Sequence, residues 1–311
     1  MQAWQFPCRL QEYGHLQASL LCSGIFASLI PCLMNGIFCY VLRHLSTSEN
    51  RRLANGFARA AFARCPKGSQ NAPAPIATCA LLGYTVRMAN KFSAVAFDLD
   101  GTLYPNRRLY RKLLPFVAAN WRLLMAFGKA RWIIRREQEK SPSLIRTDFY
   151  DYQAALTAEM LNAGADAVKE KIEALMYRGW EPLFSGVRLF PHVRDLLPEL
   201  RAAGLKLGLL SDFPPEAKLK NMGLAGLWDS VLCSEETGAL KPSAHPFLVM
   251  AGELGCPPEK ILYVGNSRPY DVAGAQRAGM KAALISRRAS GSPRADFTFQ
   301  DYRQLRDFVL N

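Results

Sequence analysis

The chain has 311 residues, half of them hydrophobic, which is enough to bury the core of one large domain or of two and excludes a chain that is disordered throughout. Its formal net charge of +13 at first favours a polyanionic partner. Residues 1–87 hold eight basic and two acidic side chains, however, and the remaining 224 residues hold 31 and 24. That modest excess, without a motif of interleaved aromatic and basic residues, predicts a protein that handles small anions and has no nucleic-acid partner.

The first 87 residues differ in character from the rest of the chain. The run from Leu16 to Leu42 carries no charged residue and is long enough to span a bilayer, and the basic residues that begin at Arg43 would keep the following part in the cytoplasm. Residues 16–42 are therefore a candidate membrane segment, and the one part expected to contact a membrane. In a second interpretation, residues 1–87 are disordered or are an extension upstream of a natural start at Met88. Only two of the eight cysteines come after this segment, which favours a reduced, cytoplasmic domain.

From Ser93 onward, short apolar runs alternate with helical patterns. The expected strands are Ala94–Phe97, Leu205–Leu210, Ser230–Cys233, Ile261–Val264, Ala282–Ile285 and Phe297–Phe299. A helical stretch from about Leu109 to Arg178 separates the first two strands, with breaks near Ser141–Pro142 and Gly164. Strands that are apolar throughout and separated by helices predict an α/β fold whose core is a doubly wound, Rossmann-like parallel sheet. Such sheets place their sites at the C-terminal edge of the strands.

Two carboxylates come directly after the first strand, at Asp98 and Asp100, and Gly101 permits a turn there. If the chain turns, both carboxylates face one pocket, where two negative charges are costly unless a cation or a proton offsets them. The pair therefore predicts metal binding, acid/base chemistry or both. An Asx-type turn that caps a loop is the structural alternative for an isolated pair of this kind.

Three further polar segments stand at or near later strand ends. Ser211-Asp212 offers a hydroxyl to an anionic oxygen, or else an N-cap for the next helix. Lys241 could neutralise charge that develops on a transferring group, or could be a solvated loop lysine. Asn266 and Asp271 offer oxygen ligands of the kind that magnesium takes, although Asp271 could instead cap a helix. All of these segments are expected at the same edge of the predicted sheet, and together, in this order, they favour a common site.

The motifs DLDGT, Ser211, Lys241-Pro242 and GNSRPYD together resemble those of the haloacid dehalogenase superfamily. The resemblance runs from Phe92 to the C-terminus, and the helix-rich insertion resembles the helical cap domain of that superfamily. It implies a hydrolase core formed by residues 92–106 and 186–311, with an all-helical cap formed by residues 107–185.

The resemblance implies a magnesium-dependent hydrolase of a small phosphate ester, similar to phosphoglycolate phosphatases. Asp98 would attack phosphorus to form an aspartyl-phosphate, and Asp100 would serve as acid and then as base. Lys241 would stabilise charge as a third catalytic residue. The implied phosphate-binding residues are Ser211, Asp212, Gly101 and Thr102. The implied magnesium ligands are Asp98, Asp100 through its backbone carbonyl, Asn266 and Asp271.

Two kinds of alternative to a phosphatase stay open: another activity of the same superfamily, and a function that is not enzymatic. Asp100 favours phosphoryl chemistry over dehalogenation, whereas a phosphomutase would use the same motifs. The position of Asn266 is usually acidic in the superfamily, so we expect weaker metal binding. A membrane-tethered binding protein on a catalytically weakened hydrolase fold is the alternative from another functional class. The expected partner is a small phosphorylated substrate, and the expected assembly is a monomer or a homodimer.

Nine Arg and Lys residues lie between Arg107 and Arg136, in the expected cap. The favoured interpretation is a solvated helix surface whose long side chains extend into water. The alternative is a basic rim that attracts an anionic substrate.

Overall fold

The computed structural model describes residues 91–287 and 291–311. The segment 16–42, and with it the whole extension 1–87, lies outside the described residues. Of the helices within those described ranges, none combines the length and the apolarity that crossing a bilayer requires.

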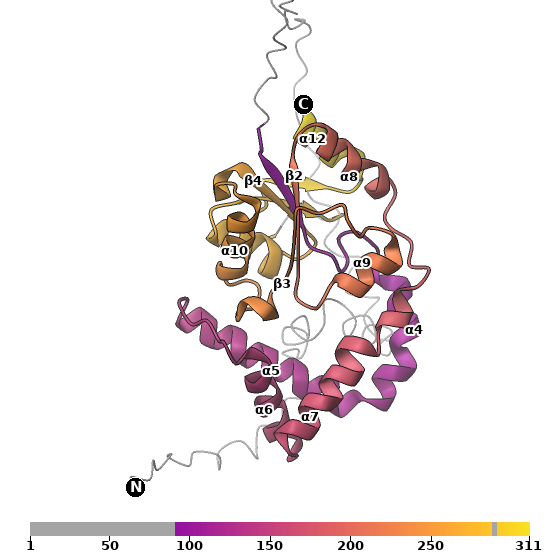
Figure 1. Ribbon diagram of the computed structural model, residues 1–311, viewed down its shortest axis with the longest axis vertical. Coiled ribbons are helices and arrows are strands. Elements are labelled where there is room, and N and C mark those ends of the chain that lie inside the picture. Colours follow the sequence, from indigo (N-terminus) through magenta and orange to yellow (C-terminus); the bar gives the residue numbers. More distant parts are fainter. Residues whose placement is uncertain (1–90, 288–290) are drawn as a thin grey trace, which may run out of the picture.

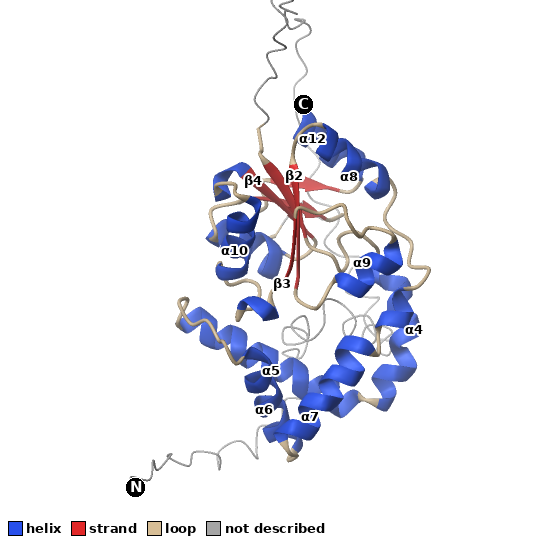
Figure 2. Ribbon diagram, viewed as in Figure 1, coloured by secondary structure: helices blue, strands red, loops and turns tan. Residues whose placement is uncertain are grey.

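Six parallel strands form one sheet in the order β3-β2-β1-β4-β5-β6 (Figures 1 and 2). The strands are β1 Ala94–Phe97, β2 Lys206–Ser211, β3 Ser230–Cys233, β4 Ile261–Gly265, β5 Lys281–Ile285 and β6 Phe297–Phe299. The predicted α/β class and parallel sheet are confirmed, and each predicted strand is found within one residue of its expected bounds. Strand β1 pairs with β2 on one side and with β4 on the other, so the strand that precedes Asp98 lies in the interior of the sheet.

Successive residues of each strand enter two different hydrophobic cores, because neighbouring side chains of a strand point to opposite faces. In β1, Val95 and Phe97 belong to one core, and Ala94 and Ala96 belong to the other. The strands are apolar throughout because helices cover both faces (Figure 2). Helices α8 (Val193–Ala202) and α12 (Tyr302–Leu310) pack on one face, and α10 (His245–Leu254) and α11 (Ala273–Arg277) on the other.

The insertion between β1 and β2 is helical, as predicted. It contains α4 (Asn106–Ala119), α5 (Trp121–Lys140), α6 (Phe149–Leu161), α7 (Ala165–Ile172) and the short helices η2 (Glu173–Arg178) and η3 (Glu181–Phe184). The expected breaks near Pro142 and Gly164 are present, and a further break at Asn120 separates α4 from α5. Helices α4 to α7 lie together beyond the C-terminal ends of the strands, so this layer faces the predicted site (Figure 1). The cap boundaries at residues 107 and 185 stay a prediction.

The remaining helical segments of the described chain are short and lie in connections between strands. They are α9 (Glu216–Met222), η4 (Glu235–Thr237), η5 (Pro258–Lys260) and η6 (Arg268–Val272). Helix α9 comes after β2 and η6 comes after β4, so both begin at the edge of the sheet where the predicted site lies.

Replacing Leu207 by alanine is expected to lower the free energy of unfolding by about 2–5 kcal/mol, because this fully buried β2 side chain would leave a cavity. The matched control is Leu248→Ala, since Leu248 is 46% exposed on α10 and its removal is expected to cost no more than about 0.5 kcal/mol. Urea denaturation monitored by circular dichroism measures both, and equal midpoints for the two variants would contradict the assigned core.

Candidate active site

The C-terminal ends of neighbouring strands bring the four sequence motifs together. Asp98 comes after β1, Ser211 ends β2 and Asn266 comes after β4, and these strands are adjacent in the order β2-β1-β4. Lys241 comes from the connection between η4 and α10, and its ammonium group reaches Asp98. Residues far apart in the sequence therefore meet at one edge of the sheet.

The ammonium group of Lys241 is buried between two carboxylates. Its Nζ lies 2.7 Å from Oδ1 of Asp98 and 2.9 Å from Oδ1 of Asp271, and it contacts the hydroxyl of Tyr263 at 3.3 Å. Burial lowers the pKa of Lys241, but the carboxylates of Asp271 and Asp98 together hold this pKa well above its ordinary value. Lys241 is therefore a charged residue of the site and not a solvated loop lysine.

Asp98 uses both of its carboxylate oxygens. Oδ1 accepts a hydrogen bond from Lys241, and Oδ2 accepts one from the hydroxyl of Thr102 at 2.7 Å. Burial raises the pKa of Asp98 to about 7, with Lys241 opposing that shift and the negative charge of Asp271 adding to it. One ammonium group thus lies between two buried carboxylates, and the excess negative charge favours the binding of a cation.

Two glycines allow the fourth motif to approach the first. A Cβ atom at Gly101, whose φ is +88°, would collide with the side-chain amide of Asn266, and a Cβ atom at Gly265 would collide with Asp271. Asn266 donates from Nδ2 to the backbone carbonyl of Asp100 at 3.1 Å. Oδ2 of Asp271 accepts the backbone N–H of Asn266 at 3.1 Å, so Asp271 braces its own loop and does not cap the next helix.

The predicted magnesium ligands offer carboxylate, amide and backbone carbonyl oxygens. Asp98 and Asp271 supply carboxylate oxygens around one ammonium group, and the amide of Asn266 lies against the carbonyl of Asp100. These are the hard oxygen donors that magnesium takes, and the excess negative charge favours a cation, so the set fits magnesium. Among residues 91–287 and 291–311, no cluster of three or more His, Cys, Asp or Glu side chains is arranged to hold a metal. A magnesium ion here would therefore depend on the amide and the backbone carbonyl as well as on carboxylates.

Asp100 has two partners that the sequence did not identify. The hydroxyl of Tyr104 donates to Oδ1 of Asp100, and Nζ of Lys218 lies 3.0 Å from Oδ1 and 2.7 Å from Oδ2. Tyr104 stands four residues after Asp100, but a tyrosine beside a motif is usually structural. Lys218 is 118 residues away on α9, and no sequence signal connects it with Asp100.

The two polar side chains of the second motif, Ser211 and Asp212, have different partners. Oγ of Ser211 accepts the backbone N–H of Phe213 at 3.2 Å, at the end of β2. The carboxylate of Asp212 lies 2.9 Å from Nη2 of Arg135 and accepts the hydroxyl of Ser234 at 2.7 Å. Burial acts to raise the pKa of Asp212, but nearby cations, led by Arg135, lower it to about 2. The phosphate contacts implied by the resemblance stay predictions for Ser211, Asp212, Gly101 and Thr102.

Two arginines of α5 connect the inserted helices to the strand ends. Arg131 forms an ion pair with Glu235 and donates to Gln153 at 3.1 Å. Arg135 donates from Nε to the backbone carbonyl of Lys241 at 2.8 Å, in addition to its ion pair with Asp212. A helix inserted after the first motif therefore braces the side chain of Asp212 in the second motif and the backbone of Lys241 in the third.

The expected solvated helix surface is wrong for these two arginines. Arg131 and Arg135 are 2% and 8% exposed, whereas Arg136 is exposed as expected. The reason is that Arg131 and Arg135 lie one helical turn apart, on the face of α5 that packs against the acidic side chains of the core. The side chains of the basic residues within 107–112 lie outside the described residues.

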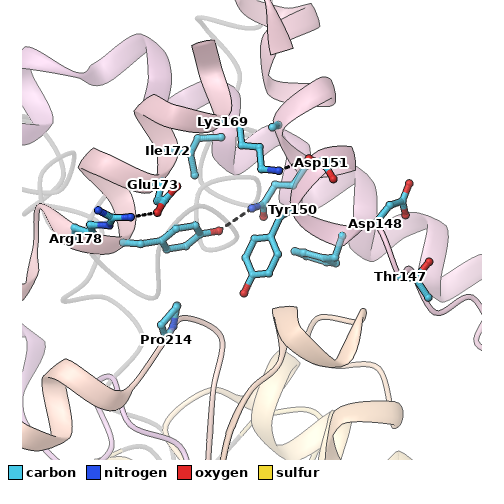
Figure 3. Close-up of a pocket in the computed structure, with 13 residues that line it drawn as sticks. Thr147, Asp148, Tyr150, Asp151, Lys169, Ile172, Glu173, Arg178 and Pro214 are labelled. Atoms are coloured by element: carbon cyan, nitrogen blue, oxygen red, sulfur yellow. Dashed lines mark hydrogen bonds and ion pairs between the residues drawn. The ribbon is translucent and has the colours of Figure 1, made fainter. Parts of the chain in front are cut away.

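A cavity of about 440 Å³ lies between the inserted helices and the loop of the second motif (Figure 3). Tyr150 points into it from α6, and Pro214 forms its wall on the side of the sheet. A second cavity of about 20 Å³ shares Tyr177 and Pro214 with the first and is also lined by Lys218. The seam between the two layers thus reaches the lysine that pairs with Asp100.

Replacing Arg135 by methionine is expected to lower the free energy of unfolding by about 3 kcal/mol, because it leaves Asp212 buried with weaker compensation. The neighbouring Arg136→Met removes the same charge from an exposed position and is expected to change stability by about 0.5 kcal/mol or less. Chemical denaturation measures both values. Equal losses in the two variants would show that the buried ion pairs do not join the two layers.

Comparison with known sequences identifies the same part of the chain. Residues 92–279 match the family described as haloacid dehalogenase-like hydrolase. Glyceraldehyde 3-phosphate phosphatase from Methanopyrus kandleri is 28% identical over 227 residues, which cover 70% of this chain and 96% of that protein. Phosphoglycolate phosphatase from Salmonella paratyphi A is 32% identical over 205 residues, which cover 60% of this chain and 77% of that protein.

Solved structures show the same fold. The HAD hydrolase YfnB from Bacillus subtilis, solved bound to magnesium, matches 71% of this chain over 100% of its own length, with a TM-score of 0.50. At 16% sequence identity, this likeness concerns the fold alone.

Proposed function

We propose that this chain, which belongs to the haloacid dehalogenase-like hydrolase family, hydrolyses small phosphate monoesters in a magnesium-dependent reaction. The observation that carries the proposal is the pair of carboxylates at the end of β1. Asp98 is buried against Lys241 and Thr102, and Asp100 lies two residues further on, where its side chain is 17% exposed. Two relatives at 28% and 32% identity are named as phosphatases of three-carbon and two-carbon phosphate esters, which supports this class of substrate.

In the proposed first step, a carboxylate oxygen of Asp98 attacks the phosphorus atom of the ester. The bond between phosphorus and the ester oxygen breaks, and that oxygen takes the proton of Asp100 as it leaves. Thr102 and Lys241 orient the attacking carboxylate, since each binds one of its oxygens. The product of the step is an aspartyl-phosphate at Asp98 and a free alcohol.

In the second step, Asp100 takes a proton from a water molecule whose oxygen attacks the same phosphorus atom. The bond between Asp98 and phosphorus breaks, which releases inorganic phosphate and restores the carboxylate of Asp98 and the acid form of Asp100. The same side chain thus donates a proton in one step and recovers one in the next.

Charge stabilisation comes from side chains that are already in place. The buried ammonium of Lys241 stands beside the attacking carboxylate, where an interaction with phosphoryl oxygens is strong because water is excluded. Ser211 ends the neighbouring strand and can donate its hydroxyl to a phosphoryl oxygen while Oγ accepts from Phe213. A magnesium ion held by Asp98, the carbonyl of Asp100, Asn266 and Asp271 would offset the remaining negative charge.

Replacing Asp98 by asparagine is expected to lower the rate of phosphate release at least about a thousandfold, because the amide removes the nucleophile. The control is Asp307→Asn, an exposed change on α12. Release of inorganic phosphate from a panel of small esters measures the effect, with chelation expected to stop turnover and added magnesium to restore it. A folded wild-type protein that releases no phosphate from any ester would favour a binding protein instead.

Replacing Asn266 by aspartate is expected to lower the magnesium concentration for half-maximal activity roughly tenfold, because a neutral ligand becomes a charged one. The matched control is Asn221→Asp, which adds the same charge at an exposed position of α9. Steady-state rates across a magnesium titration give the answer. An unchanged half-maximal concentration in Asn266→Asp would refute a role of this side chain in holding the metal.

A further inference from the structure

Lys218 is a buried lysine outside the four motifs, and it binds the side chain proposed as the acid. Its Nζ lies within hydrogen-bond distance of both carboxylate oxygens of Asp100, and its side chain is only 9% exposed. The ammonium group also lies over the rings of Phe184 and Phe213, with distances of 4.9 and 5.8 Å to the ring centroids. Helix α9 therefore delivers a cation to the place where the leaving group must lie.

This arrangement has to change when a substrate binds. The hydroxyl of Tyr104 occupies Oδ1 of Asp100, and Lys218 occupies both oxygens. The leaving oxygen must come within about 3 Å of the same carboxylate to take its proton. Once Asp100 carries the proton that this step needs, Lys218 no longer faces a carboxylate charge, and an ammonium group so far removed from water is costly without a new anionic partner.

The substrate can supply that partner. In the proposed mechanism the phosphoryl group is held at Lys241 and Ser211, so a second anionic group has to stand on the leaving group. Lys218 lies 2.7 Å from Asp100, which places its ammonium within reach of atoms one or two bonds from the leaving oxygen. The cavity beside Lys218 measures about 20 Å³ and is lined mainly by apolar side chains, with Glu181 as its acidic residue. It leaves little space beside the ammonium group, which favours a short leaving group.

We propose that Lys218 determines substrate specificity by binding a carboxylate on a short leaving group, so that the preferred substrates are phosphate esters of small hydroxy acids. The inference rests on the proposed phosphatase function and adds to it the chemical class of the alcohol. Between the two named relatives, it favours the ester that carries a carboxylate over the one that carries an aldehyde.

The test compares two esters with the same two-carbon chain, 2-phosphoglycolate and 2-hydroxyethyl phosphate, of which only the first carries a carboxylate. The wild-type protein is expected to show a kcat/KM at least about tenfold higher for 2-phosphoglycolate. Lys218→Met is expected to lower that value roughly 10- to 100-fold, mainly through KM, the size expected for the loss of a hydrogen bond to a charged group. On 2-hydroxyethyl phosphate the same variant also loses the cation beside Asp100, but the loss is expected to be smaller, so that the ratio of the two kcat/KM values falls at least about fivefold.

Two variants serve as controls. Lys218→Arg keeps the charge and is expected to retain the preference for the acid, and Lys220→Met removes a charge from an exposed position of the same helix and is expected to change neither substrate. A parallel loss on both esters in Lys218→Met would overturn the inference, because it would mean that Lys218 only positions Asp100.

The wild-type protein alone also separates the two proposals. Hydrolysis of p-nitrophenyl phosphate without any preference between the two small esters overturns the inference about Lys218 and leaves the phosphatase function standing. No hydrolysis of any of the three esters overturns the phosphatase function, and the inference with it.

Discussion

The buried ammonium of Lys241, held between the carboxylates of Asp98 and Asp271, is the interaction on which the site depends. Three charges that lie so far from water are stable only together, because removing one leaves the others without compensation. The parallel order of β1 and β4 brings the two aspartates to the same edge, and Gly265 lets Asp271 approach without a collision. The charge cluster therefore depends on three features: the pairing of β1 with β4, the absence of a side chain at Gly265, and Lys241 from a distant loop.

The inserted helices belong to the same electrostatic system. Arg135 binds the backbone of Lys241 and the carboxylate of Asp212, and Arg131 pairs with Glu235, whose pKa is raised by burial although Arg131 opposes that shift. Helix α5 thus contacts the second and third motifs on the side of the inserted layer, and the strands of the sheet position them on the opposite side. The layer that faces the site thus fixes the backbone at Lys241 and the side chain of Asp212, and its side of the seam also borders Lys218.

The sequence predicted the parts of this structure that are encoded locally. Continuous apolar runs indicated the six strands, and the polar residues at their ends indicated the positions of Asp98, Ser211 and Asn266. It did not predict Lys218, because a lysine on a short helix looks like any solvated lysine until folding brings it to Asp100. It assigned Arg131 and Arg135 to solvent for the same reason, since their acidic partners lie 77 to 104 residues away. Partners across such separations depend on topology, which local patterns do not contain. The membrane segment expected at residues 16–42 stays a prediction.

In the proposed reaction, Asp98 forms a covalent bond to phosphorus while Lys241 holds its carboxylate in place. Chemical trapping tests this most directly: the protein is mixed with a phosphate ester and magnesium, quenched during turnover and treated with borohydride, which reduces an aspartyl-phosphate to homoserine. Mass spectrometry of the resulting peptides is predicted to find homoserine at position 98 and aspartate unchanged at positions 100 and 271. Reduction at another aspartate, or none at position 98 while phosphate is being released, would show that Asp98 is not the nucleophile.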